Sequence, residues 1–169
     1  METREGEQVV KASVIWAGFL LLGVTGLGAC GEQADEAPAE AVEGVPGLSV
    51  TNARLVLPAV SGNPAAVYFD VAYDGTRGLA LSSVAVEGAE KAEFHEYAEW
   101  DGKMQMQEML RLPIKQGDRH SFEPGGKHVM AMNISPDLAE GGTANVTLTV
   151  SGGGTMTFPA EIKAAGSER

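Results

Sequence analysis

The sequence predicts an all-β fold, an antiparallel sandwich or barrel of about eight strands over residues 48–163. After Gly47, apolar and polar residues alternate in short runs. One face of a strand would hold Val67, Phe69, Val71 and Tyr73, and one face of another would hold Val146, Leu148 and Val150. No convincing long helix remains. Turn residues recur between these runs: Gly62-Asn63-Pro64, Asp74-Gly75, Asp101-Gly102, Pro124-Gly125-Gly126, Gly141-Gly142 and Gly152-Gly153-Gly154.

Residues 1–29 are expected to be a signal peptide of the lipoprotein type. Residues 12–29 carry no charge, and Leu27-Gly28-Ala29-Cys30 resembles a bacterial lipobox, which implies cleavage before Cys30 and acylation of its sulfur. The protein would then be anchored in the cell envelope by a lipid, facing away from the cytoplasm. An uncleaved signal anchor is the alternative, since about 18 apolar residues is the lower limit for a membrane span. The leader 1–11 holds three Glu against one Arg and one Lys, which is unusual for an export signal and leaves the true start codon open.

Residues 30–47 are expected to be an acidic flexible tether, because 31–47 holds five acidic residues and two prolines with little that is bulky and apolar. The short tail 164–169 completes the chain. The formal net charge of −11 and the absence of any Lys/Arg run argue against a nucleic-acid partner. A cation or a protein is the better candidate.

Imidazole and thioether side chains concentrate in one stretch of the chain. Five of the six methionines after Met1 fall between Met104 and Met132, and the stretch contains the spacing His95-x10-Met106-x21-His128-x-Met130. Thioether and neutral imidazole, without thiolate or carboxylate, is a ligand set that suits Cu(I) better than zinc, iron or calcium. Copper binding is therefore the leading hypothesis for function.

The predicted strands place these residues plausibly. His128 and Met130 are two apart on a strand and would project to the same side. Asp101-Gly102 predicts a tight turn between the strand of His95 and that of Met106, so a hairpin would bring these two together. The Pro124-Gly125-Gly126 turn would place His128 at the start of a further strand, beside that hairpin.

This spacing resembles the copper-binding signature of the periplasmic PCu(A)C copper chaperones, and the flanking residues Phe94-His95-Glu96 and 124–132 are similar too. The resemblance covers residues 48–163 and implies a cupredoxin-like Greek-key β-barrel. It assigns the Cu(I) ligands to His95, Met106, His128 and Met130. It also implies a metallochaperone rather than an enzyme, one that passes copper to an acceptor such as a cytochrome oxidase subunit, alongside Sco-type thiol proteins.

The sequence departs from the family's pattern in two places. Position 97 is Tyr, where many relatives place another methionine. The tail 163–169 lacks the His- and Met-rich extension with which some members hold a second copper. A Cu(II) site is therefore not expected.

The remaining soft residues have simpler interpretations. Met104, Met109 and Met132 are expected to fill the core, with packing beside the metal as the alternative for these three, and Met156 is expected in the core. His120 is expected to be solvated. An exposed loop residue, Trp100, would face a partner or shield the metal.

Three other classes of protein compare less well or stay open. A blue-copper electron carrier needs a Cys thiolate, and Cys30, the only cysteine, lies outside the domain. A hydrolase would need an organised nucleophile and base, and neither G-x-S-x-G nor H-E-x-x-H is present. The alternative that stays open is a metal-free, immunoglobulin-like lipoprotein that serves in adhesion or assembly.

Overall fold

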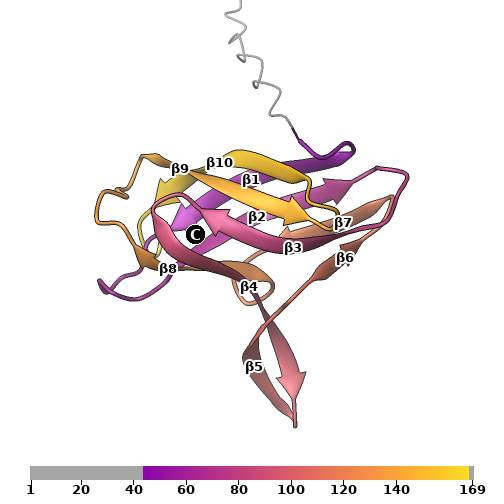
Figure 1. The fold of residues 1–169 in the computed structure, drawn as a ribbon. Helices are drawn as coiled ribbons and strands as arrows, with labels where there is room; N and C mark the ends of the chain where they lie inside the picture. Colours follow the sequence, from indigo (N-terminus) through magenta and orange to yellow (C-terminus); the bar gives the residue numbers. More distant parts are fainter. Residues whose placement is uncertain (1–43, 168–169) are drawn as a thin grey trace, which may run out of the picture. The chain divides into compact units, whose positions relative to one another are not determined.

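Alternating burial along the strands organises the domain. The structure, a computed structural model, describes residues 44–167; the predicted signal peptide, Cys30 and most of the tether lie outside them. Every second residue of β2 (Ala65–Tyr73) is buried, as its apolar-polar alternation predicts. Ten strands fall within the described residues (Figure 1), the others being β1 (Leu48–Val56), β3 (Leu79–Val86), β4 (Ala89–Trp100), β5 (Lys103–Glu108), β6 (Leu112–Ile114), β7 (Asp118–Phe122), β8 (His128–Ile134), β9 (Thr143–Val150) and β10 (Thr155–Lys163).

The strands are hydrogen-bonded in the order β5-β4-β8-β2-β1-β10-β9-β3-β6, and β7 also pairs with β2. Many neighbours in this order are far apart in sequence, and β1 runs parallel to β10. β3 and β4 lie near opposite ends of the order, yet they are consecutive in the chain and contact each other, so the sheet curls into a closed sandwich. The all-β, cupredoxin-like fold predicted from the sequence is confirmed.

The core lies between the inner faces of the curled sheet. Its largest fully buried side chains come from β1, β2, β3, β7, β8, β9 and β10. At its centre the Phe69 ring stacks on Phe122, with ring centroids 4.4 Å apart, and meets Phe158 edge-on at 5.3 Å. Aromatic contacts of this kind add to the free energy gained by burying apolar surface.

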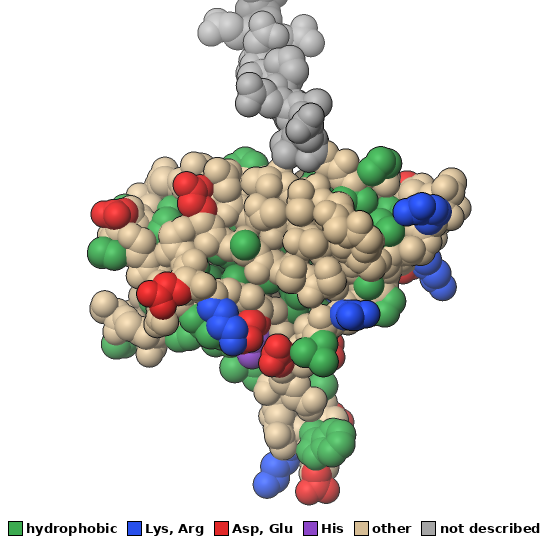
Figure 2. Space-filling model, in the orientation of Figure 1, with side chains coloured by type: hydrophobic (Ala, Val, Ile, Leu, Met, Phe, Trp, Pro, Cys, Tyr) green, Lys and Arg blue, Asp and Glu red, His purple; other side chains and the backbone are tan. Residues whose placement is uncertain are grey.

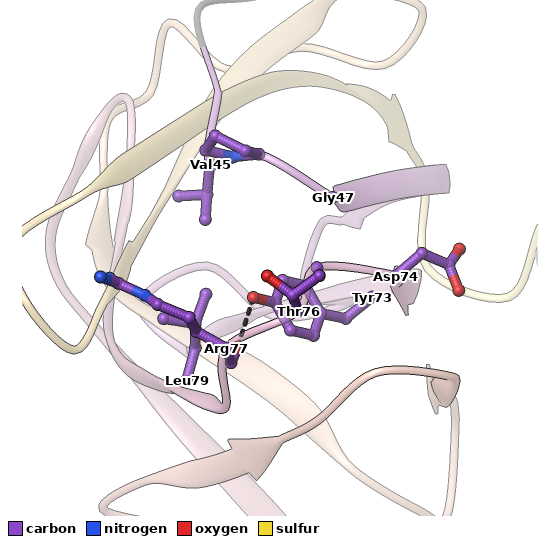
Figure 3. A pocket seen from close by; sticks show the side chains of 9 residues that line it. Val45, Gly47, Tyr73, Asp74, Thr76, Arg77 and Leu79 are labelled. Carbon is purple, nitrogen blue, oxygen red and sulfur yellow. Dashed lines mark hydrogen bonds between the residues drawn. The ribbon is translucent and has the colours of Figure 1, made fainter.

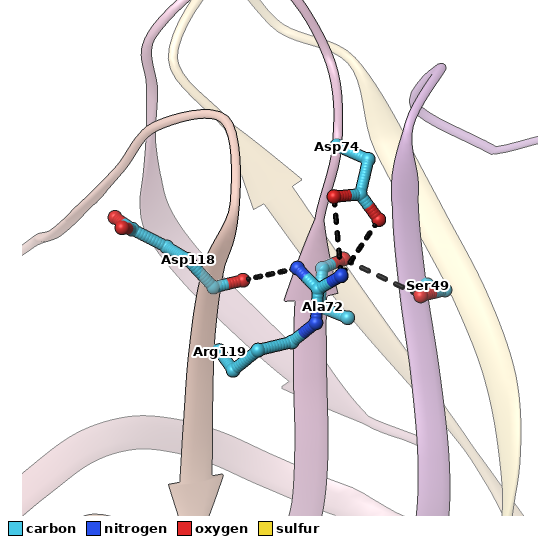
Figure 4. A network of polar contacts seen from close by, with 5 residues as sticks. All are labelled: Ser49, Ala72, Asp74, Asp118 and Arg119. Carbon is cyan, nitrogen blue, oxygen red and sulfur yellow. Dashed lines mark hydrogen bonds and ion pairs between the residues drawn. The ribbon is translucent and has the colours of Figure 1, made fainter.

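Polar contacts on the outer surface tie β7, β2 and β1 together (Figure 4). The Arg119 guanidinium on β7 donates to both carboxylate oxygens of Asp74, which directly follows β2, at 3.1 and 2.9 Å. The Ser49 hydroxyl on β1 donates to the Ala72 carbonyl on β2. Because these groups are exposed, their contribution to stability is small.

The β4–β5 hairpin projects from the body of the sandwich (Figure 1). Its turn residues Asp101 and Gly102 both have positive φ, 52° and 71°, the geometry of the two-residue hairpin turn that the Asp-Gly pair predicts. β5 is an edge strand of the sheet, with β4 as its partner. The ten strands exceed the expected eight because the residues between β5 and β8 contain two further short strands, β6 and β7.

Among the described residues, no helix combines the length and the apolar character needed to cross a membrane.

Candidate metal centre

The two predicted histidine ligands are direct neighbours on antiparallel strands. His95 of β4 pairs with His128 of β8 in the β4–β8 register, and their rings lie 5.9 Å apart between centroids. Directly opposed residues of an antiparallel pair share one face of the sheet. The Phe94–Val129 pair, one step along, points into the core, so the histidines occupy the outer face.

The two predicted methionine ligands flank the histidine pair on the same face. Met130 is two residues beyond His128 on β8 and stands opposite Glu93. Met106 on β5 stands opposite Tyr97, two residues beyond His95 on β4. Because side chains two apart on a strand project to the same side, the backbone register brings all four residues onto one face, with Met106 toward the projecting hairpin and Met130 away from it.

The loop between β7 and β8 orients the His128 ring. His128 is the first residue of β8, is only 6% exposed, and its Nδ1 lies 3.1 Å from the carbonyl oxygen of Gly126. A carbonyl can only accept, so Nδ1 carries the proton and Nε2 keeps its lone pair. The same carbonyl accepts the backbone N–H of Tyr97 at 3.4 Å, which connects the loop to β4.

The ring nitrogens of His95 are buried without a hydrogen-bond partner. Both of its ring nitrogens are inaccessible, and neither forms a hydrogen bond. The nearest ionic group is Glu93, whose Oε2 lies 3.7 Å from His95 Nε2. A buried polar group without a partner costs about 1–3 kcal/mol, so its retention calls for an explanation. A metal ion as its partner would provide one.

Burial favours the neutral form of His128. Desolvation lowers the pKa of His128 below its ordinary value of 6.5, against the opposing effect of the Gly126 hydrogen bond, and His95 nearby lowers it further. The neutral form needed for metal binding is therefore favoured at neutral pH. The hydrogen bond and the positive charge of Lys91 lower the pKa of Glu93, which keeps that carboxylate anionic beside His95.

Sequence reasoning missed the aromatic surroundings of the histidines. The Tyr97 ring lies 5.7 Å from the His128 ring, and the Tyr68 ring lies 6.5 Å from it, between centroids. Tyr97 carried a signal, because it is two residues after His95 and must share its face. Tyr68 carried none, because only the pairing of β2 with β8 brings it there.

The other methionines divide between core and surface. Met109 and Met156 pack partly buried against the core, in agreement with the prediction. Met132 is half-buried on the same side of β8 as Met130. The expectation for Met104 was wrong: its side chain is 63% exposed, because β5 lies in the projecting hairpin, where the body of the sandwich does not cover it.

Two further expectations concern His120 and Trp100. His120 is not freely solvated: it pairs with the core residue Val71, its side chain is only 25% exposed, and its Nε2 is buried without a hydrogen bond. Pairing of β7 with β2 draws it toward the core. Trp100 is 67% exposed beside the hairpin turn, as expected of an interaction residue. Figure 2 shows apolar and charged side chains gathered on this hairpin.

The four predicted ligands do not line the cavity between β1 and β2. A cavity of about 430 Å³ lies at the start of β1 and the end of β2, with Val45, Tyr73 and Arg77 in its wall (Figure 3), and the Tyr73 hydroxyl donates to the Arg77 carbonyl there at 2.5 Å. Within residues 44–167, no three His, Cys, Asp or Glu side chains gather as a metal site. A metal site at His95 and His128 would therefore depend on the thioethers of Met106 and Met130.

The fold and this arrangement define the class, a cupredoxin-like β-domain with a His/Met face. Similar solved structures include the copper-bound PCuAC domain from PmoF2 (22% identity, 71% of this chain and 95% of that one, TM-score 0.59) and the apo PCuAC domain from PmoF1 (23%, 71% and 96%, 0.59). Another is the solution structure of CuI-DR1885 from Deinococcus radiodurans (23%, 80% and 89%, 0.55). At these identities the likeness shows the fold.

The family follows from the sequence itself. Residues 48–162 match the family described as "Putative lipoprotein LpqE-like". The match spans well over half of the chain, and the chain belongs to this LpqE-like family. Comparison with curated proteins returns no match.

Proposed function

We propose that this protein is an extracytoplasmic metallochaperone that binds Cu(I) through His95, Met106, His128 and Met130. The proposal rests on the imidazole of His95, whose two nitrogens are buried without a hydrogen bond. It lies directly opposite His128, whose Nδ1 is held by a backbone carbonyl. Two imidazoles with available lone pairs, flanked by two thioethers, form a neutral set of soft and borderline donors that suits Cu(I).

The distribution of exposure suits a carrier that must release its metal. His128 is buried, whereas Met106 is 45% exposed on the edge strand β5. An incoming donor of an acceptor protein would meet Met106 first and replace it, while the histidines still hold the ion. Thioethers also avoid the disulfides that paired cysteines would form in an oxidising compartment.

The structural neighbours and the family support the proposal. One neighbour is described as a copper-bound PCuAC domain and another as a Cu(I) form, which indicates that this fold can hold copper. The lipoprotein family agrees with acylation at Cys30, so we propose a lipid anchor that holds the domain outside the cytoplasmic membrane. A copper centre of cytochrome oxidase, or a Sco-type protein, is the acceptor class that we propose.

Anaerobic Cu(I) titration against the chelator bathocuproine disulfonate tests the metal site. The wild-type chain should remove one equivalent of Cu(I) from the chelator, and His95→Ala and Met130→Leu should each weaken binding by at least about tenfold. Circular dichroism should show that both variants keep the β fold. If the wild-type chain leaves the chelator's colour unchanged, the metal-free assembly module becomes the better interpretation.

Metabolic labelling with a palmitate analogue in the native cell tests the anchor separately. The wild-type chain should incorporate the label, and Cys30→Ser should not. Equal labelling of both would contradict acylation at Cys30 and leave the copper site unaffected.

A further inference from the structure

Tyr97 belongs to the metal site although no ligand pattern includes it. We propose that the aromatic face of Tyr97 contacts the bound Cu(I), strengthens its binding by a cation–π interaction and covers it from solvent. The inference rests on the proposed function, because it requires an ion between His95 and His128.

The register places Tyr97 beside every proposed ligand except Met130. It follows His95 by two residues on the same face of β4, and it stands directly opposite Met106 on β5. Its ring lies 5.7 Å from the His128 ring at an interplanar angle of 31°, and the two histidine rings are 5.9 Å apart. The His128 ring therefore has both the His95 ring and the Tyr97 ring within 6 Å, and an ion bound at His128 would lie near the tyrosine ring.

The backbone keeps Tyr97 in this place. Its N–H donates to the Gly126 carbonyl, which also accepts the hydrogen bond from His128 Nδ1. One carbonyl thus links the strand of Tyr97 to the ring of His128. At 44% exposure, the Tyr97 side chain also forms part of the outer surface of the site.

The face of the Tyr97 ring, rather than its hydroxyl, is the part that would interact with Cu(I). An aromatic face attracts a cation within about 6 Å of the ring centroid, and the attraction grows when the cation is shielded from water. A monovalent copper ion surrounded by thioethers and neutral imidazoles is such a cation. By covering the ion, the ring would also slow its contact with solvent.

Tyr68 provides a matched comparison. Its ring is near His128 as well, at 6.5 Å, but the Arg54 guanidinium lies over it, 4.9 Å from the centroid. Among residues 44–167, no Lys or Arg is placed in this way over Tyr97. The ring of Tyr68 already contacts the Arg54 guanidinium, so we assign the copper contact to Tyr97.

The experiment compares Tyr97→Phe, Tyr97→Leu and Tyr68→Leu in the full chain by anaerobic Cu(I) competition with bathocuproine disulfonate. Tyr97→Phe should bind within about twofold of wild type, and Tyr97→Leu should bind about two- to thirtyfold more weakly than Tyr97→Phe. Tyr68→Leu should lose less than Tyr97→Leu. Cu(I) addition should also change the tyrosine ultraviolet absorption of wild type and not that of Tyr97→Leu.

Two results would overturn the inference while the proposed function stands. In the first, Tyr97→Leu binds Cu(I) as tightly as Tyr97→Phe. In the second, Tyr97→Phe loses as much affinity as Tyr97→Leu, which would assign the role to the hydroxyl. A wild-type chain that binds no Cu(I) would overturn the proposed function as well. Thermal melting of each variant shows whether a loss of Cu(I) binding is caused by unfolding of the domain.

Discussion

His95 and His128 face each other across the β4–β8 ladder, with ring centroids 5.9 Å apart on the outer face of the sheet. The ladder on which they stand is hydrogen-bonded, so their separation is set by backbone pairing rather than by flexible loops. Met106 and Met130 extend the same face to either side. Rigid imidazoles with thioethers at the periphery are suited to retaining an ion while one ligand is exchanged.

Met106 and Met104 give a matched pair of exposed thioethers. Both lie on β5 on the same side, but Met106 is opposite Tyr97 and Met104 is opposite Glu99, farther from the histidines. We expect Met106→Leu to weaken Cu(I) binding by at least about tenfold, or about 1.4 kcal/mol, and Met104→Leu to change it less than about twofold. Chelator competition measures both, and equal losses would argue against a specific role for Met106.

Acid should destabilise the apo domain through His128. Its pKa is lowered in the folded state, so the unfolded chain binds a proton more readily, and stability falls as pH drops below the ordinary value of 6.5. Above that value this contribution is constant. Urea unfolding of wild type and His128→Gln between pH 5 and 8 measures it: the loss below pH 6.5 should be smaller in the variant, and an unchanged loss would assign the effect to other groups.

The loop that holds His128 should tolerate alanine at one glycine and not at its neighbour. Gly125 has φ of 80°, and a Cβ there would meet no atom within 4 Å, so Gly125→Ala costs backbone strain alone, about 1–2 kcal/mol. Gly126 has no such φ, and its Cβ would make ordinary contact with Glu123. We expect Gly126→Ala to stay within about 0.5 kcal/mol of wild type in urea unfolding.

Copper binding provides a second measurement on this loop. Strain at Gly125 should displace the Gly126 carbonyl that fixes the His128 ring, so Gly125→Ala should also bind Cu(I) more weakly than Gly126→Ala. If the two variants bind equally, the orientation of His128 does not depend on the strained glycine.

Aromatic residues of the core and of the hairpin should respond differently to truncation. Phe69 is 1% exposed and contacts the rings of Phe122 and Phe158, so Phe69→Ala should cost about 3–5 kcal/mol. Trp100 is 67% exposed, and Trp100→Ala should cost less than about 0.5 kcal/mol. Chemical unfolding checks both, and a large loss at Trp100 would show that the hairpin packs against the body.

Local sequence signals predicted much of the site. The Asp101-Gly102 turn, the start of β8 at His128 and the shared face of His128 and Met130 were all predicted from turn chemistry and the two-residue period of a strand. These features depend on neighbours within a few residues. The exposure of Met104 and the partial burial of His120 were predicted wrongly, because each depends on whether a distant strand covers the residue.

The sequence by itself determined the all-β class, the hairpin and the set of candidate ligands, because periodicity, turn residues and ligand softness are local properties. Only the tertiary structure decided that β4 pairs with β8 in the register that opposes His95 and His128, that a Gly126 carbonyl orients His128, and that Tyr97 and Tyr68 surround it. The physical reason is that pairing between strands distant in the chain is selected by burial of the whole core, which no short segment specifies.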